Sequence, residues 1–192
     1  MGNLSVIGGK AKGFKLRSVP GDSTRPIMAK VKAAVFNIVS PYILGSSWMD
    51  LFAGTGSVGI EALSRGASLV RFVDNQSAAV KTIEANLQHT GLETLAEVWY
   101  KNAFTLLDLP ADRQFDFLYI APPQYKELWS RSLFALDKNP GWLKDDTWII
   151  VQIDKVEYQD LDLEHLKLFD RRTYGSTELV FYMVRDGILD SE

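Results

Sequence analysis

The 192-residue sequence contains no cysteine and only two histidines. The absence of cysteine excludes disulfide frameworks, thiolate zinc sites, iron–sulfur clusters and cysteine nucleophiles. The two histidines, His89 and His165, leave little material for a histidine metal site or a Ser-His-Asp triad. We therefore expect a protein that works without a metal.

Long hydrophobic runs are also missing. No stretch of about 18 apolar residues could span a membrane, and the N-terminus lacks the apolar segment of a signal peptide. Apolar residues make up 46% and charged residues 23%, an ordinary globular balance. We expect a cytoplasmic, monomeric protein with no membrane partner.

Charge is distributed unevenly along the chain. The net charge is −3, but residues 1–32 carry seven basic side chains and one acid, whereas the remainder carries 14 basic and 23 acidic side chains. The net charge is therefore +6 for the basic arm, residues 1–32, and −9 for residues 33–192. This distribution is typical of proteins in which one end binds the phosphates of a nucleic acid. A solvated lysine-rich terminus would give the same pattern, so both interpretations stand at this point.

The order of elements predicts an α/β fold. A hairpin is expected over residues 3–18 and a helix over 27–39, and then strands and helices alternate. Alternation predicts a mostly parallel sheet with helices on both faces, closed by an antiparallel hairpin at Gly175-Ser176. We divide the chain into a basic hairpin and loop, 1–26, and a cofactor-binding domain, 27–192. The expected strands cover 47–52, 69–73, 95–100, 115–120, 147–153, 166–173 and 178–184, and the helices between them 57–65, 76–89 and 125–137.

A glycine-rich turn follows the first of these strands. Gly54, Gly56 and Gly59 match G-x-G-x-x-G, which permits a dinucleotide site and hence an NAD-dependent oxidoreductase. Asp50, at the strand end, would repel a pyrophosphate but suits a ligand with a positive amino group. S-adenosylmethionine carries both an ammonium and a sulfonium, so it fits this turn better.

Other strand ends supply further candidate cofactor residues. Asp74 lies 18 residues after Gly56, where a carboxylate can accept hydrogen bonds from ribose hydroxyls. Asn102-Ala103 follows the third strand and could meet the adenine ring. The complete expected set is Asp50, Phe52, Gly54, Thr55, Gly56, Asp74, Asn75, Asn102 and Ala103.

A rigid proline loop, Ile120-Ala121-Pro122-Pro123-Gln124-Tyr125, follows the fourth strand. In open α/β sheets ligands bind beyond the carboxyl ends of strands, so this loop is expected to face the same crevice as the glycine turn. Prolines lack an N–H, and carbonyls near them can accept hydrogen bonds from a substrate amine. Arg171-Arg172, near the closing turn, could be a phosphate contact but reads more simply as a pair of surface arginines.

These residues resemble the class I S-adenosylmethionine methyltransferases, and more narrowly the RsmD-type 16S rRNA guanine-N2 methyltransferase family. The resemblance covers nearly the whole chain, in segments that include Val6–Lys10, Thr24–Pro26, Val31–Asn37, Asp50–Ala67, Phe115–Pro123 and Arg172–Gly175. It implies a Rossmann-like methyltransferase fold with a seven-stranded sheet and a small N-terminal hairpin. It also implies cofactor binding by the glycine turn and Asp74, and a substrate amine held by an Asp-Pro-Pro-Tyr or Asn-Pro-Pro-Tyr loop.

The sequence departs from that family loop. Ala121 stands at the acid or amide position and Gln124 at the aromatic position, with Tyr125 one residue later. An alanine methyl accepts no hydrogen bond, so Pro122, Gln124 and Tyr125 are the expected catalytic residues. The expected function is methylation of guanine N2 in 16S rRNA of the small ribosomal subunit or its assembly intermediates. A catalytically impaired relative that binds RNA and cofactor is the alternative. Expected RNA contacts are Lys10, Lys12, Arg17 and Arg25.

Overall fold

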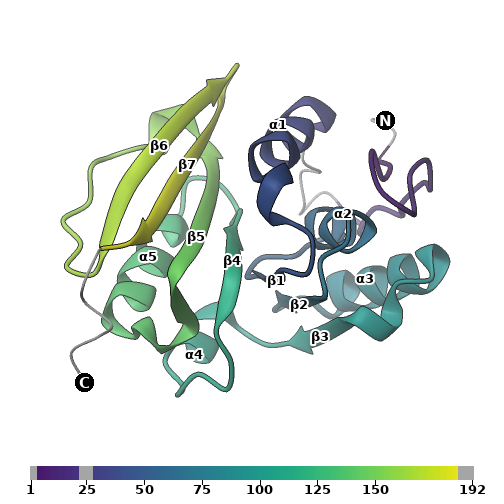
Figure 1. Ribbon diagram of the computed structural model, residues 1–192, viewed down its shortest axis with the longest axis horizontal. Helices are drawn as coiled ribbons and strands as arrows, with labels where there is room; N and C mark the ends of the chain where they lie inside the picture. Colours follow the sequence, from purple (N-terminus) through teal and green to yellow (C-terminus); the bar gives the residue numbers. More distant parts are fainter. Residues whose placement is uncertain (1–3, 22–27, 186–192) are drawn as a thin grey trace. The chain divides into compact units, whose positions relative to one another are not determined.

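The computed structural model describes residues 4–21 and 28–185, which divide into two compact units (Figure 1). The first unit, Met1–Asn102, contains α1 (Ala29–Val39), β1 (Ser47–Asp50), α2 (Ser57–Ser64), β2 (Leu69–Asp74), α3 (Ser77–Thr90) and β3 (Ala96–Tyr100), with the 3-10 helices η1 (Ser40–Tyr42) and η2 (Glu93–Leu95). The second, Ala103–Glu192, contains α4 (Ala103–Leu107), β4 (Phe115–Ile120), α5 (Leu128–Lys138), η3 (Pro140–Trp142), β5 (Leu143–Asp154), η4 (Lys155–Glu157), β6 (Leu166–Tyr174) and β7 (Thr177–Val184).

The strands of the first unit run parallel in the order β3-β2-β1. β2 is buried from Val70 to Asp74, as expected of a central parallel strand covered on both faces. Arg71 is buried as well. Its guanidinium pairs with the Glu97 carboxylate at 2.7 Å and lies 3.9 Å from the centre of the Trp99 ring. The charge on β2 is therefore neutralised by its neighbour on β3.

The N-terminal segment forms an irregular hairpin rather than two regular strands: Ser5 and Lys15 form an isolated bridge, and backbone hydrogen bonds also join Val6 to Phe14 and Leu4 to Leu16. Its apolar side chains, including Val6 and Leu16, are buried. The backbone N–H groups of Ile7 and Ala11 donate to side chains of α2. The hairpin is thus packed onto the first unit. The predicted domain boundary between residues 26 and 27 lies outside the described residues and stays a prediction.

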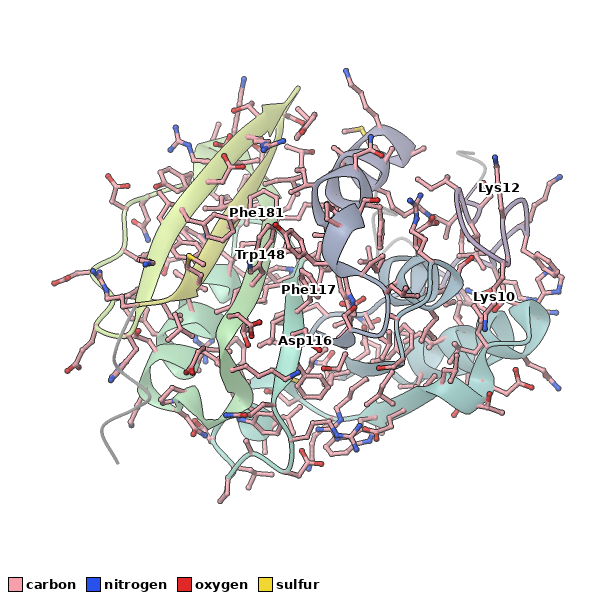
Figure 2. All side chains as sticks on the ribbon, viewed as in Figure 1. Lys10, Lys12, Asp116, Phe117, Trp148 and Phe181 are labelled. Carbon is pink, nitrogen blue, oxygen red and sulfur yellow. The ribbon has the colours of Figure 1, made fainter. Side chains whose placement is uncertain are left out.

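The second unit has the strand order β4-β5-β7-β6. β4 and β5 are parallel, whereas β5, β7 and β6 pair antiparallel, with the β6–β7 turn at Gly175. Phe117, Trp148 and Phe181 come from the neighbouring strands β4, β5 and β7, and the first two rings meet edge to face (Figure 2). The predicted seven strands, their parallel pairs and the closing antiparallel hairpin are confirmed.

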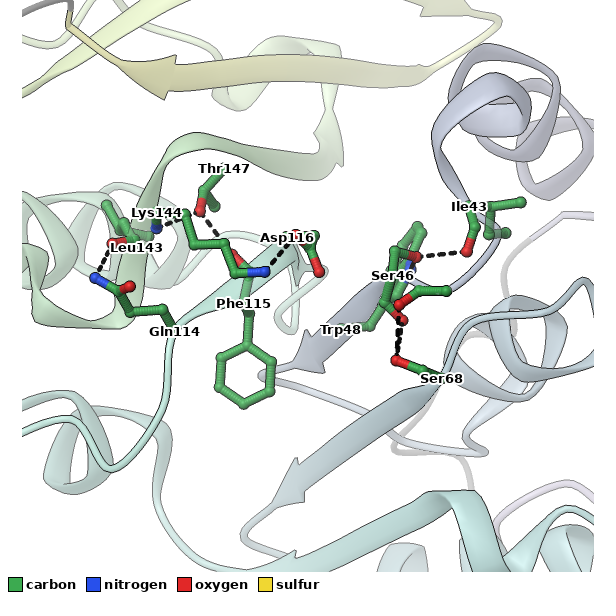
Figure 3. Close-up of polar contacts among 11 residues, drawn as sticks. Ile43, Ser46, Trp48, Ser68, Gln114, Phe115, Asp116, Leu143, Lys144 and Thr147 are labelled. Atoms are coloured by element: carbon green, nitrogen blue, oxygen red, sulfur yellow. Dashed lines mark hydrogen bonds and ion pairs between the residues drawn. The ribbon is translucent and has the colours of Figure 1, made fainter.

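Some element boundaries differ from the expectation. β5 starts at Leu143 rather than 147, because Leu143 already pairs with Phe115 of β4. The Thr147 hydroxyl also donates to the Phe115 carbonyl, and the Lys144 ammonium pairs with Asp116 (Figure 3). α5 starts at Leu128 rather than 125, because Tyr125 and Glu127 have positive φ angles. The five-residue helix α4 was not predicted, since so short an element shows no clear periodicity.

Candidate functional site

The turn between β1 and α2 depends on its glycines for two separate reasons. Gly56 precedes the first residue of α2 and has φ +74°, a conformation that costs other residues energy. Gly59 lies inside α2, where an added Cβ would come within 2.3 Å of the Phe72 ring. The first glycine reverses the chain, and the second lets α2 approach β2 closely.

Asp74, at the end of β2, holds the glycine turn in place. One of its carboxylate oxygens accepts the N–H of Gly54 at 2.8 Å, and the other accepts the N–H of Gln76 at 2.9 Å. Carboxylate oxygens have more than one acceptor site each, so these bonds leave capacity for a ligand hydroxyl. The structure thus brings two predicted cofactor residues, Gly54 and Asp74, into direct contact.

Asp50, at the end of β1, is the most unusual group in this unit. Its side chain is 3% exposed, and its Oδ1 atom has no hydrogen-bond partner among the residues that the structure describes. Burial and repulsion from the Asp74 carboxylate raise the pKa of Asp50 to about 7, although the Phe52 N–H lowers it. A buried carboxylate with one oxygen left without a partner is costly. A cationic ligand group would relieve that cost, so this turn fits the ammonium of S-adenosylmethionine.

The other predicted cofactor residues occupy varied positions. Thr55 and Gly56 are buried, Phe52 is half-buried, and Asn75 and Asn102 are exposed. Ala103 begins α4 and belongs to the second unit, as do the predicted catalytic residues Pro122, Gln124 and Tyr125. In that loop Pro122 is buried, Gln124 is half-buried and Tyr125 is exposed. Their cofactor and substrate roles stay predictions.

Three of the four predicted RNA-contact residues lie on the described N-terminal segment that packs on the first unit. Lys10 and Lys12 are exposed (Figure 2). Arg17 is exposed as well, and Arg25 lies outside the described residues. Lys32, counted with the basic arm from sequence, is instead buried. Its ammonium donates to the Ser5 carbonyl at 2.6 Å and to the Ser57 hydroxyl at 2.9 Å, and it lies 3.4 Å from Glu61. Burial lowers the pKa of Lys32, and Glu61 opposes that shift.

The arginines near the closing turn have partners within their own hairpin. Arg171 pairs with Glu178 at 2.9 Å and stacks over the Tyr158 ring, and Arg172 pairs with Asp170 at 2.8 Å. These contacts agree with the simpler interpretation of two surface arginines.

Several residues in these networks carried no sequence signal. Asn86 accepts the N–H of Arg17, and it donates to the carbonyls of Arg17 and Thr55. Glu157 accepts the N–H of Tyr125 from 32 residues away. Such long-range bonds follow from the tertiary fold and leave no spacing pattern.

Within residues 4–21 and 28–185, no group of three or more His, Cys, Asp or Glu side chains could hold a metal ion. None of the described helices has the length and apolar character needed to cross a membrane.

Comparison with known proteins identifies the family to which the chain belongs. Residues 4–183 match the family described as conserved hypothetical protein 95. The Bacillus subtilis protein YlbH is 36% identical over 184 residues, covering 95% of this chain and all of its own length. Ribosomal RNA small subunit methyltransferase D of Haemophilus influenzae is 33% identical over 156 residues, covering 80% of each chain.

Solved structures confirm the Rossmann-like methyltransferase fold. The Escherichia coli protein yhhF is 27% identical with a TM-score of 0.85, covering 96% of this chain and 99% of its own. An RNA methyltransferase from Salinibacter ruber, solved with S-adenosyl-L-homocysteine, shares the fold at 13% identity and a TM-score of 0.66, covering 85% of this chain and 96% of its own. The chain therefore belongs to the conserved hypothetical protein 95 family, the RsmD-type methyltransferases that its sequence resembles.

Proposed function

We propose that this protein transfers a methyl group from S-adenosylmethionine to the N2 amine of a guanine in 16S rRNA, as a cytoplasmic monomer acting on the small ribosomal subunit or its assembly intermediates. The observation that carries the proposal is the buried carboxylate of Asp50, whose Oδ1 atom has no hydrogen-bond partner among the described residues, in a chain related to rRNA small subunit methyltransferase D. A carboxylate in that state calls for a cation, and the proposed cofactor supplies one.

The cofactor contributes an electrophilic methyl group on a sulfonium. In the proposed complex Asp50 pairs with the cofactor's ammonium, and Asp74 accepts hydrogen bonds from the ribose hydroxyls. The bond from Asp74 to Gly54 keeps that carboxylate oriented while it does so. Phe52, Thr55, Gly56, Asn75, Asn102 and Ala103 complete the proposed site.

The substrate side of the reaction depends on positioning. The guanine N2 lone pair is delocalised into the ring, so an acceptor for its protons strengthens it as a nucleophile and orients it. With Ala121 unable to accept, the Pro122 carbonyl and the Gln124 side-chain oxygen are the proposed acceptors, and Tyr125 stacks on the extruded base. When bound, the cofactor would supply the methyl carbon to the N2 lone pair, and the carbon–sulfur electron pair would stay on the sulfur of S-adenosylhomocysteine. The Pro122 carbonyl and the Gln124 side-chain oxygen would hold the N2 protons, and the one that is displaced would pass to solvent water.

The hairpin lysines supply the proposed electrostatic contact with RNA. Lys10 and Lys12 are exposed on a packed scaffold, and Arg17 and Arg25 extend the basic set. Such contacts release counterions from the RNA, so binding should weaken steeply with salt.

The test is tritiated methyl transfer to under-methylated small-subunit particles, together with calorimetric titration of S-adenosylhomocysteine. Wild type should transfer methyl to guanine N2. Asp50→Asn should weaken S-adenosylhomocysteine about tenfold to a hundredfold, because a charge-assisted bond is lost. Asp145→Ala, an exposed carboxylate on β5, is the matched control and should bind as wild type does. Absence of methyl incorporation at saturating enzyme would contradict the proposal.

Ala121 favours one second candidate, a protein that keeps cofactor and RNA affinity but has lost turnover. Replacing Ala121 by Asp separates the two. Under the proposed function wild type is active and the variant is slower, since the loop has its own working chemistry. If wild type is inactive and Ala121→Asp gains activity, the second candidate is correct.

A further inference from the structure

The loop after β4 has an unusual backbone. Tyr125 has φ +60° and Glu127 has φ +53°, and neither residue is a glycine. Side chains rarely adopt this left-handed region, so it persists where surrounding contacts hold it in place. The loop that carries the proposed base-stacking residue therefore needs anchors, and the structure supplies two.

The first anchor is the carboxylate of Glu157, in η4 after β5. Its Oε2 accepts the backbone N–H of Tyr125 at 2.8 Å, and its Oε1 accepts the N–H of Asp154 at 3.4 Å. One side chain thus ties the loop after β4 to the corner that follows the neighbouring parallel strand.

The second anchor is Asp154, the last residue of β5. Its Oδ2 accepts the phenol O–H of Tyr125 at 3.2 Å, and its Oδ1 accepts the N–H of Val156. Asp154 and Glu157 also cap η4 reciprocally, which orients both carboxylates. Tyr125 is therefore held at its backbone and at the far end of its ring.

The ring fixed in this way is 67% exposed, so it is not held for core packing. A surface tyrosine gains little stability from two such bonds and loses side-chain freedom by making them. An exposed aromatic ring that is already ordered can stack on a planar base without that entropy cost on binding.

We propose that Asp154 and Glu157 are positioning residues that hold Tyr125 ready to stack on the target guanine. This inference rests on the proposed function, because it gives Tyr125 its partner. It assigns to Asp154, at the end of β5, and to Glu157, in η4, part of the positioning that Ala121 cannot provide. They act through Tyr125 and do not themselves contact the reacting atoms.

The experiment is a double-mutant cycle with Tyr125→Phe and Asp154→Ala, assayed for kcat and KM of methyl transfer and for affinity to under-methylated small-subunit particles. Each single variant should lower kcat/KM about fivefold or more, since each removes the hydrogen bond between Tyr125 and Asp154, and Asp154→Ala also removes the cap on η4. Because the shared bond is already absent in Tyr125→Phe, adding Asp154→Ala should cause a clearly smaller loss than it causes in wild type. Asp145→Ala is the charge-matched control and should leave both quantities unchanged.

Glu157 is tested by rescue. Glu157→Ala should lower kcat/KM about tenfold, and Glu157→Gln should recover part of the loss because its amide oxygen still accepts one N–H. S-adenosylhomocysteine affinity should be unchanged in every loop variant, which separates a positioning effect from damage to the first unit.

The outcomes distinguish this inference from the proposed function. If wild type transfers methyl but the losses of Tyr125→Phe and Asp154→Ala multiply, the positioning role is wrong and the function stands. If wild type transfers no methyl, yet Tyr125→Ala, Asp154→Ala and Glu157→Ala all weaken particle binding, the proposed methyl-transfer activity is wrong and the positioning role stands. If the loop variants change neither turnover nor particle binding, the positioning role is wrong.

Discussion

The side-chain amide of Asn86, in α3, donates a hydrogen bond of 2.9 Å to the backbone carbonyl of Thr55 in the glycine turn. The same side chain accepts the N–H of Arg17 at 2.8 Å and donates to its carbonyl at 3.1 Å. Asn86 is fully buried. One carboxamide therefore satisfies backbone groups of both the basic hairpin and the proposed cofactor turn.

Asn86→Ala should destabilise the protein by about 2–4 kcal/mol, because it leaves three backbone groups without their partner. Denaturant unfolding of the full chain measures the loss. Gln88→Ala, at an exposed position on the same helix, is the control and should change stability by less than about 0.5 kcal/mol. Equal stability of the two variants would show that the buried amide contributes nothing.

Lys32→Met should destabilise the protein by about 3 kcal/mol, because it leaves the buried Glu61 carboxylate without one of its cationic partners. Arg65 and the N–H of Ile7 still contact Glu61 and limit the loss. Lys30→Met, on the exposed side of the same helix, is the matched control and should unfold at the wild-type denaturant concentration. A loss below about 1 kcal/mol for Lys32→Met would contradict this account of the buried pair.

Asp50 should make both ligand binding and stability depend on pH. With its pKa at about 7 in the fold, its charged fraction rises between pH 6 and pH 8. S-adenosylhomocysteine affinity should therefore rise about tenfold over that range. Calorimetric titration at each pH measures the change, and Asp50→Asn should remove it. A pH-independent wild type would contradict an ion pair at Asp50.

The pH dependence of folding stability that Asp50 causes is opposite to that of ligand affinity: stability should fall as pH rises. The folded state holds the Asp50 proton up to about pH 7, whereas the unfolded chain releases it near the ordinary value of 3.8. Between these values the fold binds more protons, so Asp50 lowers stability as pH rises. Asp50→Asn should stabilise the free protein at pH 8, by at most about 4 kcal/mol, and the gain should shrink towards pH 4.

Much of this fold could be predicted because its strands are buried and its turns carry glycine. β4 was predicted with its observed bounds, 115–120, since its apolar run is short and β-prone. β5 was predicted too short, because Asp145 and Asp146 interrupt its apolar pattern, whereas Leu143 still pairs with Phe115 of β4 and regular pairing resumes at Trp148 after a register shift. The local sequence pattern indicates which residues are buried. Strand pairing, in contrast, depends on a partner strand elsewhere in the sequence, so the local pattern does not reveal where a strand begins.

The candidate site was predictable to a similar extent. Asp50 and Asp74 followed from their positions at strand ends and Gly54 from the glycine-rich turn, and the structure brings Gly54 and Asp74 into contact. Lys32 could not be recognised as buried, because a lysine on a helix is usually solvated and its partner Glu61 is 29 residues away. The basic arm is consequently less exposed than its sequence charge suggests.

The exposed lysines of the hairpin should carry a measurable part of RNA binding. Replacing Lys10 and Lys12 together by Ala should reduce the slope of log affinity against log salt by about 2, one for each lost phosphate contact. S-adenosylhomocysteine affinity should not change, because both side chains are exposed and their backbone bonds are kept.

Deleting residues 1–18 is a harsher test, since it would also uncover Asn86 and Glu61. Lys138→Ala, at the end of α5, is the control for charge alone. If the double variant and Lys138→Ala have the same salt slope as wild type, the hairpin lysines do not contact phosphate.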